Sequence, residues 1–138
     1  MGRKSATRGG VAMLGSSPIV AVVAVKDLER GKEFYGGTLG LREAEVDEPG
    51  GVLYSCQGET QLLVYQSDYA GTNQATAASW QVADIDQEIA ALKEKGITSE
   101  QYDLPGVTRT GDVHTVGGLR AAWFKDPDGN ILNLVNRD

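Results

Sequence analysis

Short apolar runs and amphipathic helical stretches follow one another along this chain in an order that occurs twice. Apolar runs at residues 19–25 and 77–82 are each followed by an aspartate, Asp27 or Asp84, and then by a helical stretch that ends at a glycine. An aspartate at this position accepts hydrogen bonds from free backbone N–H groups, and glycine takes the left-handed conformation that ends a helix. The motif VKDL at residues 25–28 thus returns as VADI at residues 82–85.

Three candidate strands follow each predicted helix. They cover residues 41–46, 52–57 and 61–65 in the first half, and residues 98–104, 119–125 and 131–135 in the second. The pattern predicts an α+β fold of two βαβββ modules, at about residues 18–66 and 77–136. A polar linker joins the modules, and residues 18–138 form one domain. Residues 1–17, rich in Gly, Ser and Arg, are predicted to be a flexible tail.

Composition and charge narrow the class of protein. The chain has 138 residues, which suits one domain, and 41% of them are hydrophobic, as in globular proteins. Its 13 basic and 19 acidic residues give a net charge of −6, which argues against nucleic-acid binding. The longest apolar run is too short to span a bilayer. The single cysteine, Cys56, excludes an internal disulfide, so we expect a cytoplasmic protein.

Several of these motifs together carry a resemblance to a known family. The matching segments are residues 25–28, Phe34-Tyr35, residues 39–41 (LGL), residues 82–85 and residues 124–130 (FKDPDGN). With them, residues 18–136 resemble the vicinal oxygen chelate superfamily, which includes glyoxalase I, extradiol dioxygenases, and fosfomycin- and bleomycin-resistance proteins. The resemblance implies mixed sheets that curl around a U-shaped cavity. It also implies that a chain of this size forms a homodimer.

The resemblance further implies a divalent metal held by inward-facing residues on four strands. Counting from the two helix-capping aspartates and from the DPDG turn, these positions are Val20, Leu63, Ala78 and Asn133. Valine, leucine and alanine cannot bind a metal, and an asparagine offers one neutral amide oxygen. A metal centre needs three or four N, O or S ligands. The sequence therefore predicts the family fold without its metal site and without a cofactor.

Strand alternation then selects the side chains that share a face with these positions and point into the cavity. They are Val20, Val22, Ala24, Gln61, Leu63, Tyr65, Ala78, Trp80, Val82, Ile131, Asn133 and Val135, with Trp123 on the penultimate strand. From this set we select Val22, Gln61, Leu63, Tyr65, Trp80, Trp123 and Asn133 as ligand-binding residues. Such an apolar, aromatic pocket suits a flat or hydrophobic small molecule. In the alternative reading the two tryptophans fill the space as core, and Asn133 bonds to backbone groups.

Two hypotheses about function follow. The first is a metal-independent protein that binds a small apolar or aromatic molecule, with sequestration of an antibiotic as one form. The second is a glyoxalase-like lyase, isomerase or dioxygenase with a non-standard site. Its candidate catalytic residue is His114, placed in a predicted loop at residues 105–118 that resembles a lid. A third possibility is a dimerisation or regulatory module with a filled cavity.

Overall fold

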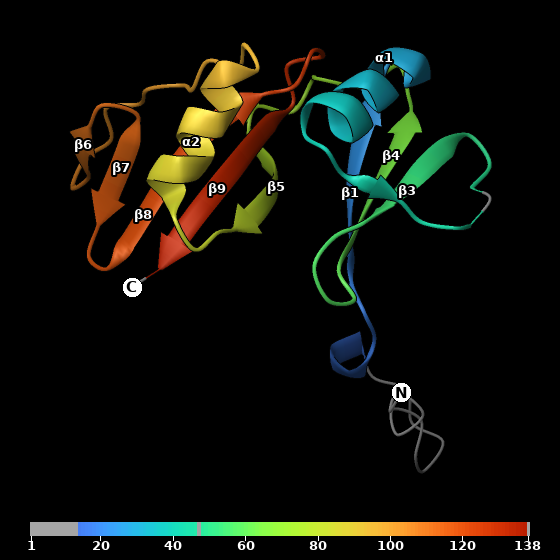
Figure 1. The fold of residues 1–138 in the computed structure, drawn as a ribbon, viewed down its shortest axis with the longest axis horizontal. Coiled ribbons are helices and arrows are strands. Elements are labelled where there is room, and N and C mark those ends of the chain that lie inside the picture. The colour runs from blue at the N-terminus through green and yellow to red at the C-terminus, as the bar shows by residue number, and fades with distance from the viewer. Residues whose placement is uncertain (1–13, 47, 138) are drawn as a thin grey trace.

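Two β-sheets, each covered by helix on one face, make up the computed structural model of this chain (Figure 1). The structure describes residues 14–46 and 48–137. Most of the predicted tail therefore lies outside the described residues. Leu14–Ser16 form a short, exposed 3₁₀ turn. Within the described ranges no helix has the length and apolar character that crossing a membrane requires.

The first module forms sheet 1, whose strand order is β1-β4-β3-β2. Its elements are β1 (Val20–Val25), α1 (Leu28–Lys32), a π-helical turn (Glu33–Thr38), β2 (Arg42–Glu43), β3 (Gly51–Ser55) and β4 (Gln61–Gln66). Asp27 caps α1 as predicted, because its carboxylate accepts the N–H groups of Glu29 and Arg30 at 3.0 and 3.3 Å. β1 pairs with β4 in parallel, and the other pairs are antiparallel.

The second module forms sheet 2, whose strand order is β5-β9-β8-β7-β6. Its elements are β5 (Thr76–Gln81), α2 (Ile85–Glu94), β6 (Thr108–Thr110), β7 (Val113–Val116), β8 (Leu119–Lys125) and β9 (Ile131–Arg137). Asp84 caps α2 through a 3.1 Å bond from the Gln87 N–H. The α+β class and the two βαβββ-type modules are confirmed, and the two sheets are not closed.

The prediction for residues 98–118 was wrong in two places. Residues 98–104 do not form a strand, since only Glu100 makes a bridge, to Trp123. Residues 105–118 were predicted as a loop, yet they contain the hairpin of β6 and β7. The signal lay in the β-branched residues on both sides of Gly111-Asp112, a pair typical of hairpin turns. The four glycines of this stretch instead favoured a loop.

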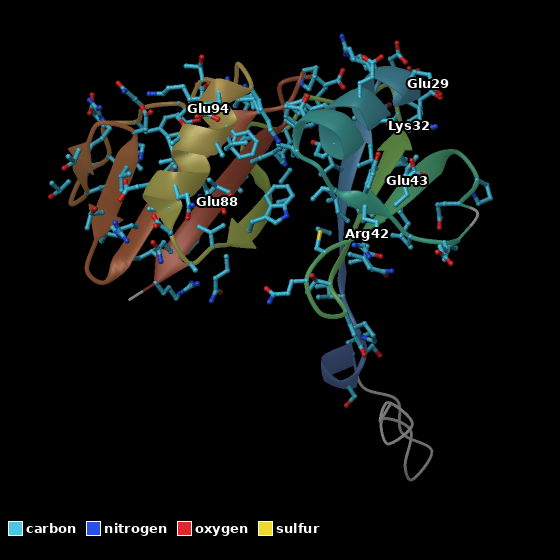
Figure 2. The ribbon with its side chains drawn as sticks, in the orientation of Figure 1. Glu29, Lys32, Arg42, Glu43, Glu88 and Glu94 are labelled. Atoms are coloured by element: carbon cyan, nitrogen blue, oxygen red, sulfur yellow. The ribbon has the colours of Figure 1, made fainter. Side chains whose placement is uncertain are left out.

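The hydrophobic core lies between each sheet and its helices. In sheet 1 the side chains of Val23, Val25 and Val64 are buried against Phe34 and Tyr35 of the π-helical turn. In sheet 2 the corresponding residues are Phe124, Leu132 and Leu134, which pack against Ile85 and Ile89 of α2. The charged residues of the helices labelled in Figure 2, including Glu29, Lys32, Glu88 and Glu94, lie on the outside. The opposite face of each sheet carries no helix, and we call it the open face.

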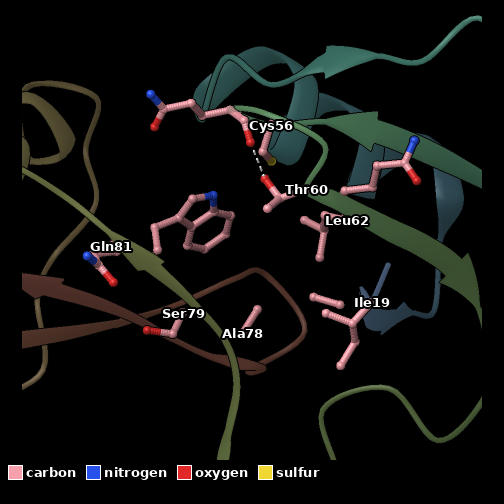
Figure 3. A pocket seen from close by; sticks show the side chains of 11 residues that line it. Ile19, Cys56, Thr60, Leu62, Ala78, Ser79 and Gln81 are labelled. Atoms are coloured by element: carbon pink, nitrogen blue, oxygen red, sulfur yellow. Dashed lines mark hydrogen bonds between the residues drawn. The ribbon is translucent and has the colours of Figure 1, made fainter. Parts of the chain in front are cut away.

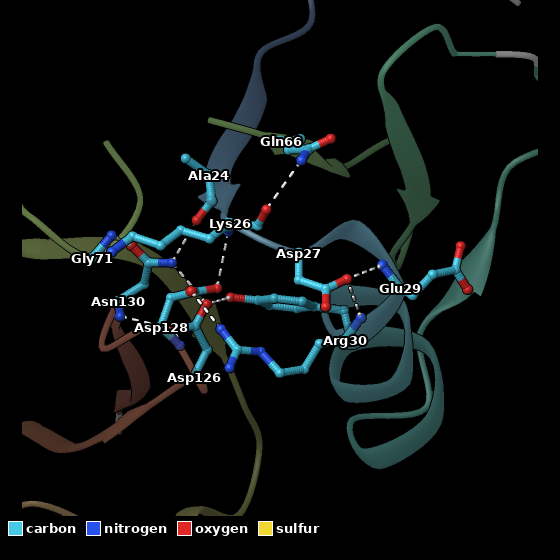
Figure 4. Close-up of polar contacts among 11 residues, drawn as sticks. Ala24, Lys26, Asp27, Glu29, Arg30, Gln66, Gly71, Asp126, Asp128 and Asn130 are labelled. Atoms are coloured by element: carbon cyan, nitrogen blue, oxygen red, sulfur yellow. Dashed lines mark hydrogen bonds and ion pairs between the residues drawn. The ribbon is translucent and has the colours of Figure 1, made fainter. Parts of the chain in front are cut away.

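The turn at residues 126–130 joins the two modules (Figure 4). Its buried Asp126 accepts the Tyr35 hydroxyl at 2.7 Å, and the Asn130 amide donates to the Ala24 carbonyl at 2.7 Å. Asp128 forms an ion pair with Arg30 at 2.7 Å. Three elements of the first module, namely β1, α1 and the π-helical turn, thus meet one tight turn of the second module. The DPDGN motif is therefore a structural latch between the modules.

The linker is fitted to this latch at one glycine. Gly71 has φ = +74°, and a Cβ there would lie 2.0 Å from the carbonyl oxygen of Asp128. Its N–H donates to the Asn130 side chain at 3.1 Å. Only glycine permits both this left-handed backbone and so close an approach.

Candidate ligand-binding site

The open face of sheet 1 presents apolar side chains to solvent. Paired residues on neighbouring strands point to the same face, and the register pairs Val22 with Leu63 and Ala24 with Tyr65. Val22 is 49% exposed and Tyr65 is 39% exposed, whereas Val23 is buried on the helix side. The predicted site residues Val22, Leu63 and Tyr65 therefore share one face, as alternation indicated.

The open face of sheet 2 differs from the prediction by one residue on β5. Asn133 of β9 pairs with Ser79 on one side and with Trp123 on the other. Ser79 thus shares the open face, and Ala78, Trp80 and Val82 do not. In both modules the open-face residues lie an odd number of positions before the helix-capping aspartate. The prediction for β5 counted an even number of positions back from Asp84, and it therefore selected residues that point to the helix side.

Trp80 consequently belongs to the helix side of sheet 2. Its ring stacks on Phe124 with a centroid distance of 6.5 Å and an interplanar angle of 24°. It also lines a pocket of about 400 Å³ at the junction of the modules, with Gln61, Cys56 and Ile19 (Figure 3). The seven predicted ligand-binding residues therefore lie in three places: the open face of sheet 1, the open face of sheet 2, and this junction.

The residues at the family's metal positions do not fit a metal ion. Asn133 is buried, and its amide is already bonded within the protein. Its Oδ1 accepts the Ser79 hydroxyl at 2.5 Å, and its Nδ2 donates to the Ala122 carbonyl at 3.1 Å. Val20 and Leu63 offer no donor atom. Over residues 14–46 and 48–137, no group of three or more His, Cys, Asp and Glu side chains is placed to hold a metal ion.

An aromatic cluster marks the open face of sheet 2. The ring of Trp123 makes edge-to-face contacts with His114 and Tyr102, at centroid distances of 4.9 and 5.4 Å. Its indole N–H donates to the Thr76 hydroxyl at 3.1 Å. A groove of about 760 Å³ lies beside this cluster. Its lining residues are Gly71, Asn73, Gln74, Ala75, Thr76, Tyr102, Leu104, Trp123, Lys125, Gly129 and Ile131.

The groove is suited to a planar apolar molecule. Its wall includes two aromatic rings, and Leu104 is 44% exposed there. Side-chain amides of Asn73 and Gln74 and the ammonium group of Lys125 stand at the same groove and offer polar contacts. Lys125 approaches Glu100 at 4.0 Å. The lining is therefore mixed: apolar and aromatic side chains can contact an apolar ligand, and the polar side chains can orient it.

His114 lies in strand β7, opposite Ala121, and not in a loop as predicted. Its side chain is 2% exposed, and its Nε2 accepts the backbone N–H of Tyr102 at 2.9 Å. Since Nε2 already accepts this bond, the neutral ring carries its proton on Nδ1 and has no free lone pair there. This arrangement does not favour His114 as a general base.

Tyr102 and Leu104 are two of the groove residues that the sequence did not single out. Both belong to the irregular segment after α2, which crosses the open face without forming a strand. Their placement depends on the Glu100 N–H, which donates to the Trp123 carbonyl at 2.7 Å. The one signal in the sequence was that Tyr102 is an aromatic residue near the end of the predicted strand 98–104. This signal did not indicate that Tyr102 contacts Trp123.

The fold and these motifs define the class of protein. The model of the Glyoxalase/Bleomycin resistance protein/Dioxygenase superfamily matches residues 18–134, and the chain belongs to this superfamily. The family resemblance drawn from the sequence motifs is confirmed.

Individual relatives span almost the whole chain. YurT of Bacillus subtilis (strain 168) is 27% identical over an alignment of 135 positions, which covers 86% of this chain and 98% of YurT. The structure of TnmS3, an antibiotic binding protein from Streptomyces sp. CB03234, is 24% identical with a TM-score of 0.65. The match covers 88% of this chain and 96% of TnmS3. A glyoxalase/bleomycin resistance protein from the same Streptomyces is 26% identical with a TM-score of 0.61, over 86% of this chain and 98% of that one.

Proposed function

We propose that this chain is a metal-independent binding protein for a small apolar or aromatic molecule, held in the groove beside Trp123. The observation that carries the proposal is the aromatic cluster of Trp123, Tyr102 and His114 next to a groove of about 760 Å³. Aromatic rings held at fixed angles present large apolar surface with little entropy to lose. A planar ligand gains contact there without requiring the cluster to rearrange.

Two further observations support this function. The positions that would hold the family's metal carry Val20, Leu63 and a serine–asparagine pair, and this residue set supports binding without a metal. The similar structure of TnmS3 is that of an antibiotic binding protein. Sequestration of an aromatic antibiotic is therefore the form of binding that we propose to test first.

We also propose that the chain forms a homodimer through the open face of sheet 1. The support is the exposed apolar strip of Val20, Val22 and Tyr65 on β1 and β4. A contiguous apolar strip of this kind is unusual on the surface of a monomer. A second copy of this chain would remove it from water.

Fluorescence titration tests the binding function. The protein is dialysed against EDTA and titrated with the neutral dye N-phenyl-1-naphthylamine, and then with a panel of aromatic antibiotics that compete with the dye. We expect saturable binding that added nickel, zinc, manganese or iron does not alter. Trp123→Ala should weaken dye binding about tenfold, because it removes the largest ring of the groove.

Two variants serve as matched controls. Trp80→Phe removes the other indole from the helix side and should leave dye affinity within about twofold. Tyr65→Ala removes an exposed ring from sheet 1 and should do the same. Equal affinity in Trp123→Ala and the unaltered protein would contradict the proposed site. Binding that appears only after a metal is added would contradict metal independence.

A further inference from the structure

We propose that His114 is a positioning residue for the groove: it holds the backbone of Tyr102 through Nε2 and supports the ring of Trp123. The consequence for ligand binding rests on the proposed function. The effect on Tyr102 does not, since it follows from the contacts of this side chain alone. His114 does not touch the groove itself but stands behind two residues that line it.

The bond to Tyr102 ties an irregular segment to a regular strand. The Tyr102 N–H donates to Nε2 of His114 at 2.9 Å across 12 residues of sequence. On one side of Tyr102, the Glu100 N–H bonds to the Trp123 carbonyl, and on the other Asp103 forms an ion pair with Arg109 at 3.3 Å. Asp103 is almost fully exposed, so that ion pair contributes little. The buried hydrogen bond to His114 therefore holds Tyr102 more firmly than the exposed ion pair of Asp103 does.

The other ring nitrogen shows why a histidine is informative here. Nδ1 is buried and has no hydrogen-bond partner among the residues that the structure describes. A buried donor without a partner costs stability, and an aliphatic side chain at this position would avoid that cost. What histidine supplies in return is the acceptor that Tyr102 uses. The geometry therefore assigns the role of His114 to Nε2.

The three rings extend this anchoring to the groove. The planes of His114 and Trp123 lie at 87°, and those of Tyr102 and Trp123 at 74°. Such edge-to-face contacts are favourable and depend on angle. At its other end Trp123 is held by its bond to Thr76. If Tyr102 moves, Trp123 loses one of the contacts that set its orientation. The positions of both aromatic rings that line the groove then change.

Three substitutions of His114 separate the effect of its hydrogen bond to Tyr102 from the effect of its ring. In His114→Gln, Oε1 reaches about as far as the imidazole Nε2 and restores the acceptor without the ring. In His114→Asn the amide is chemically the same but ends at the level of Nδ1 and cannot reach Tyr102. His114→Phe keeps a ring and removes the acceptor. Asp112→Ala is the control, because it removes an exposed bond of the same segment, from Gln101 at 2.9 Å.

Amide hydrogen exchange at Tyr102, followed by NMR, is the readout that does not need a ligand. We expect exchange to accelerate about fivefold or more in His114→Asn and His114→Phe, and to remain near the original rate in His114→Gln and Asp112→Ala. Dye affinity should fall about fivefold in the same two variants and recover with glutamine. Thermal melts establish that each variant is folded.

The outcomes divide cleanly between the two proposals. Unchanged exchange at Tyr102 in the asparagine and phenylalanine variants overturns the positioning role. Faster exchange with unchanged dye affinity also overturns it, since the bond would then have no effect on the groove. If the unaltered protein binds neither the dye nor an antibiotic, the proposed function fails, and the exchange pattern still decides whether His114 holds Tyr102.

Discussion

The open faces of the two sheets differ although the modules repeat the same topology. Sheet 1 presents aliphatic side chains such as Val22 and Leu63, and they are partly exposed to solvent. Sheet 2 presents Trp123, His114 and Asn133, and the side chains of His114 and Asn133 are buried and hydrogen-bonded. The same backbone pattern thus carries a surface suited to another apolar surface in one module, and a surface suited to a small molecule in the other.

Under the proposed function, the two modules of this fold divide ligand binding and association between them. The helix-capping aspartates recur in both modules, and so does the parallel pairing of the first strand with the last. The open-face positions point away from the helices, so packing against a helix does not constrain their residues. We therefore place ligand binding on sheet 2 and association on sheet 1, and the following changes test that division.

The largest effect is expected from the latch that joins the two sheets. Asp126→Ala removes a buried carboxylate that accepts bonds from Tyr35, from Asn130 and from two backbone N–H groups. We expect the free energy of unfolding to fall by about 3 kcal/mol or more, because several buried donors lose their acceptor. Chemical denaturation measures it. The exposed Asp86→Ala should change stability by less than about 0.5 kcal/mol, and equal losses in both variants would contradict the latch.

A smaller effect on stability is expected at alkaline pH. Burial raises the pKa of the Tyr35 hydroxyl above its ordinary value, and the adjacent Asp126 carboxylate raises it further. Burial also raises the pKa of Tyr54 and of Tyr102, with smaller contributions from Glu43 and Glu100. A tyrosine whose pKa is raised in the folded state stabilises the protein fully below about pH 10, and this contribution is lost as the pH rises further.

Tyr35→Phe isolates the share of Tyr35 in this pH dependence. The variant should lose about 2 kcal/mol at pH 7, because the hydroxyl bond to a buried carboxylate disappears. Its stability should also fall less steeply above pH 10 than that of the unaltered protein. Parallel curves for the two proteins in urea denaturation between pH 7 and pH 11 would show that Tyr35 does not carry the effect.

Association through sheet 1 is tested by Val22→Asp. A carboxylate at this half-exposed position costs little in the monomer but cannot be covered by an apolar partner. We expect the dimer dissociation constant to rise about tenfold or more, measured by light scattering over a range of concentrations. Dye affinity should stay within about twofold. A loss of dye affinity that follows dissociation would instead show that both open faces contribute to one site.

The smallest effect is expected from a matched pair of leucines. Leu104 lines the groove on sheet 2, and Leu53 lies on the open face of sheet 1, where it pairs with Leu63. Leu104→Ala should weaken dye binding about threefold through lost apolar contact, and Leu53→Ala should leave it unchanged. The reverse order in a dye titration would place the ligand on sheet 1.

Much of the fold was predictable because its signals are local. The two capping aspartates, the helix-ending glycines and the turn residues act over a few positions, and the structure confirms two modules of the same order. The hairpin of β6 and β7 was missed, although its threonines and valines on either side of Gly111 carried a local signal. The resemblance to the superfamily also depended on local motifs, and it is confirmed.

The site was less predictable because it depends on which residues the sheets bring together. Alternation placed Val22, Leu63 and Tyr65 on one face correctly, since the register of β1 and β4 follows from their apolar pattern. It placed Trp80 on the wrong face, because the even spacing from Asp84 selected Ala78 and Trp80, whereas Ser79 shares the open face with Asn133. Tyr102 reaches the groove through contacts with β7 and β8 that no local pattern encodes.

The sequence by itself determined the modules, their caps, the latch motif and the lack of the family's metal ligands. These four features depend on residue identity and on short spacings along the chain, and residue identity and spacing do not require contacts with distant segments. Tertiary structure alone decided that Trp123, Tyr102 and His114 meet at one groove, and that Trp80 belongs to the helix side. The physical reason is that contacts between distant segments follow from how strands pair and how an irregular segment crosses them.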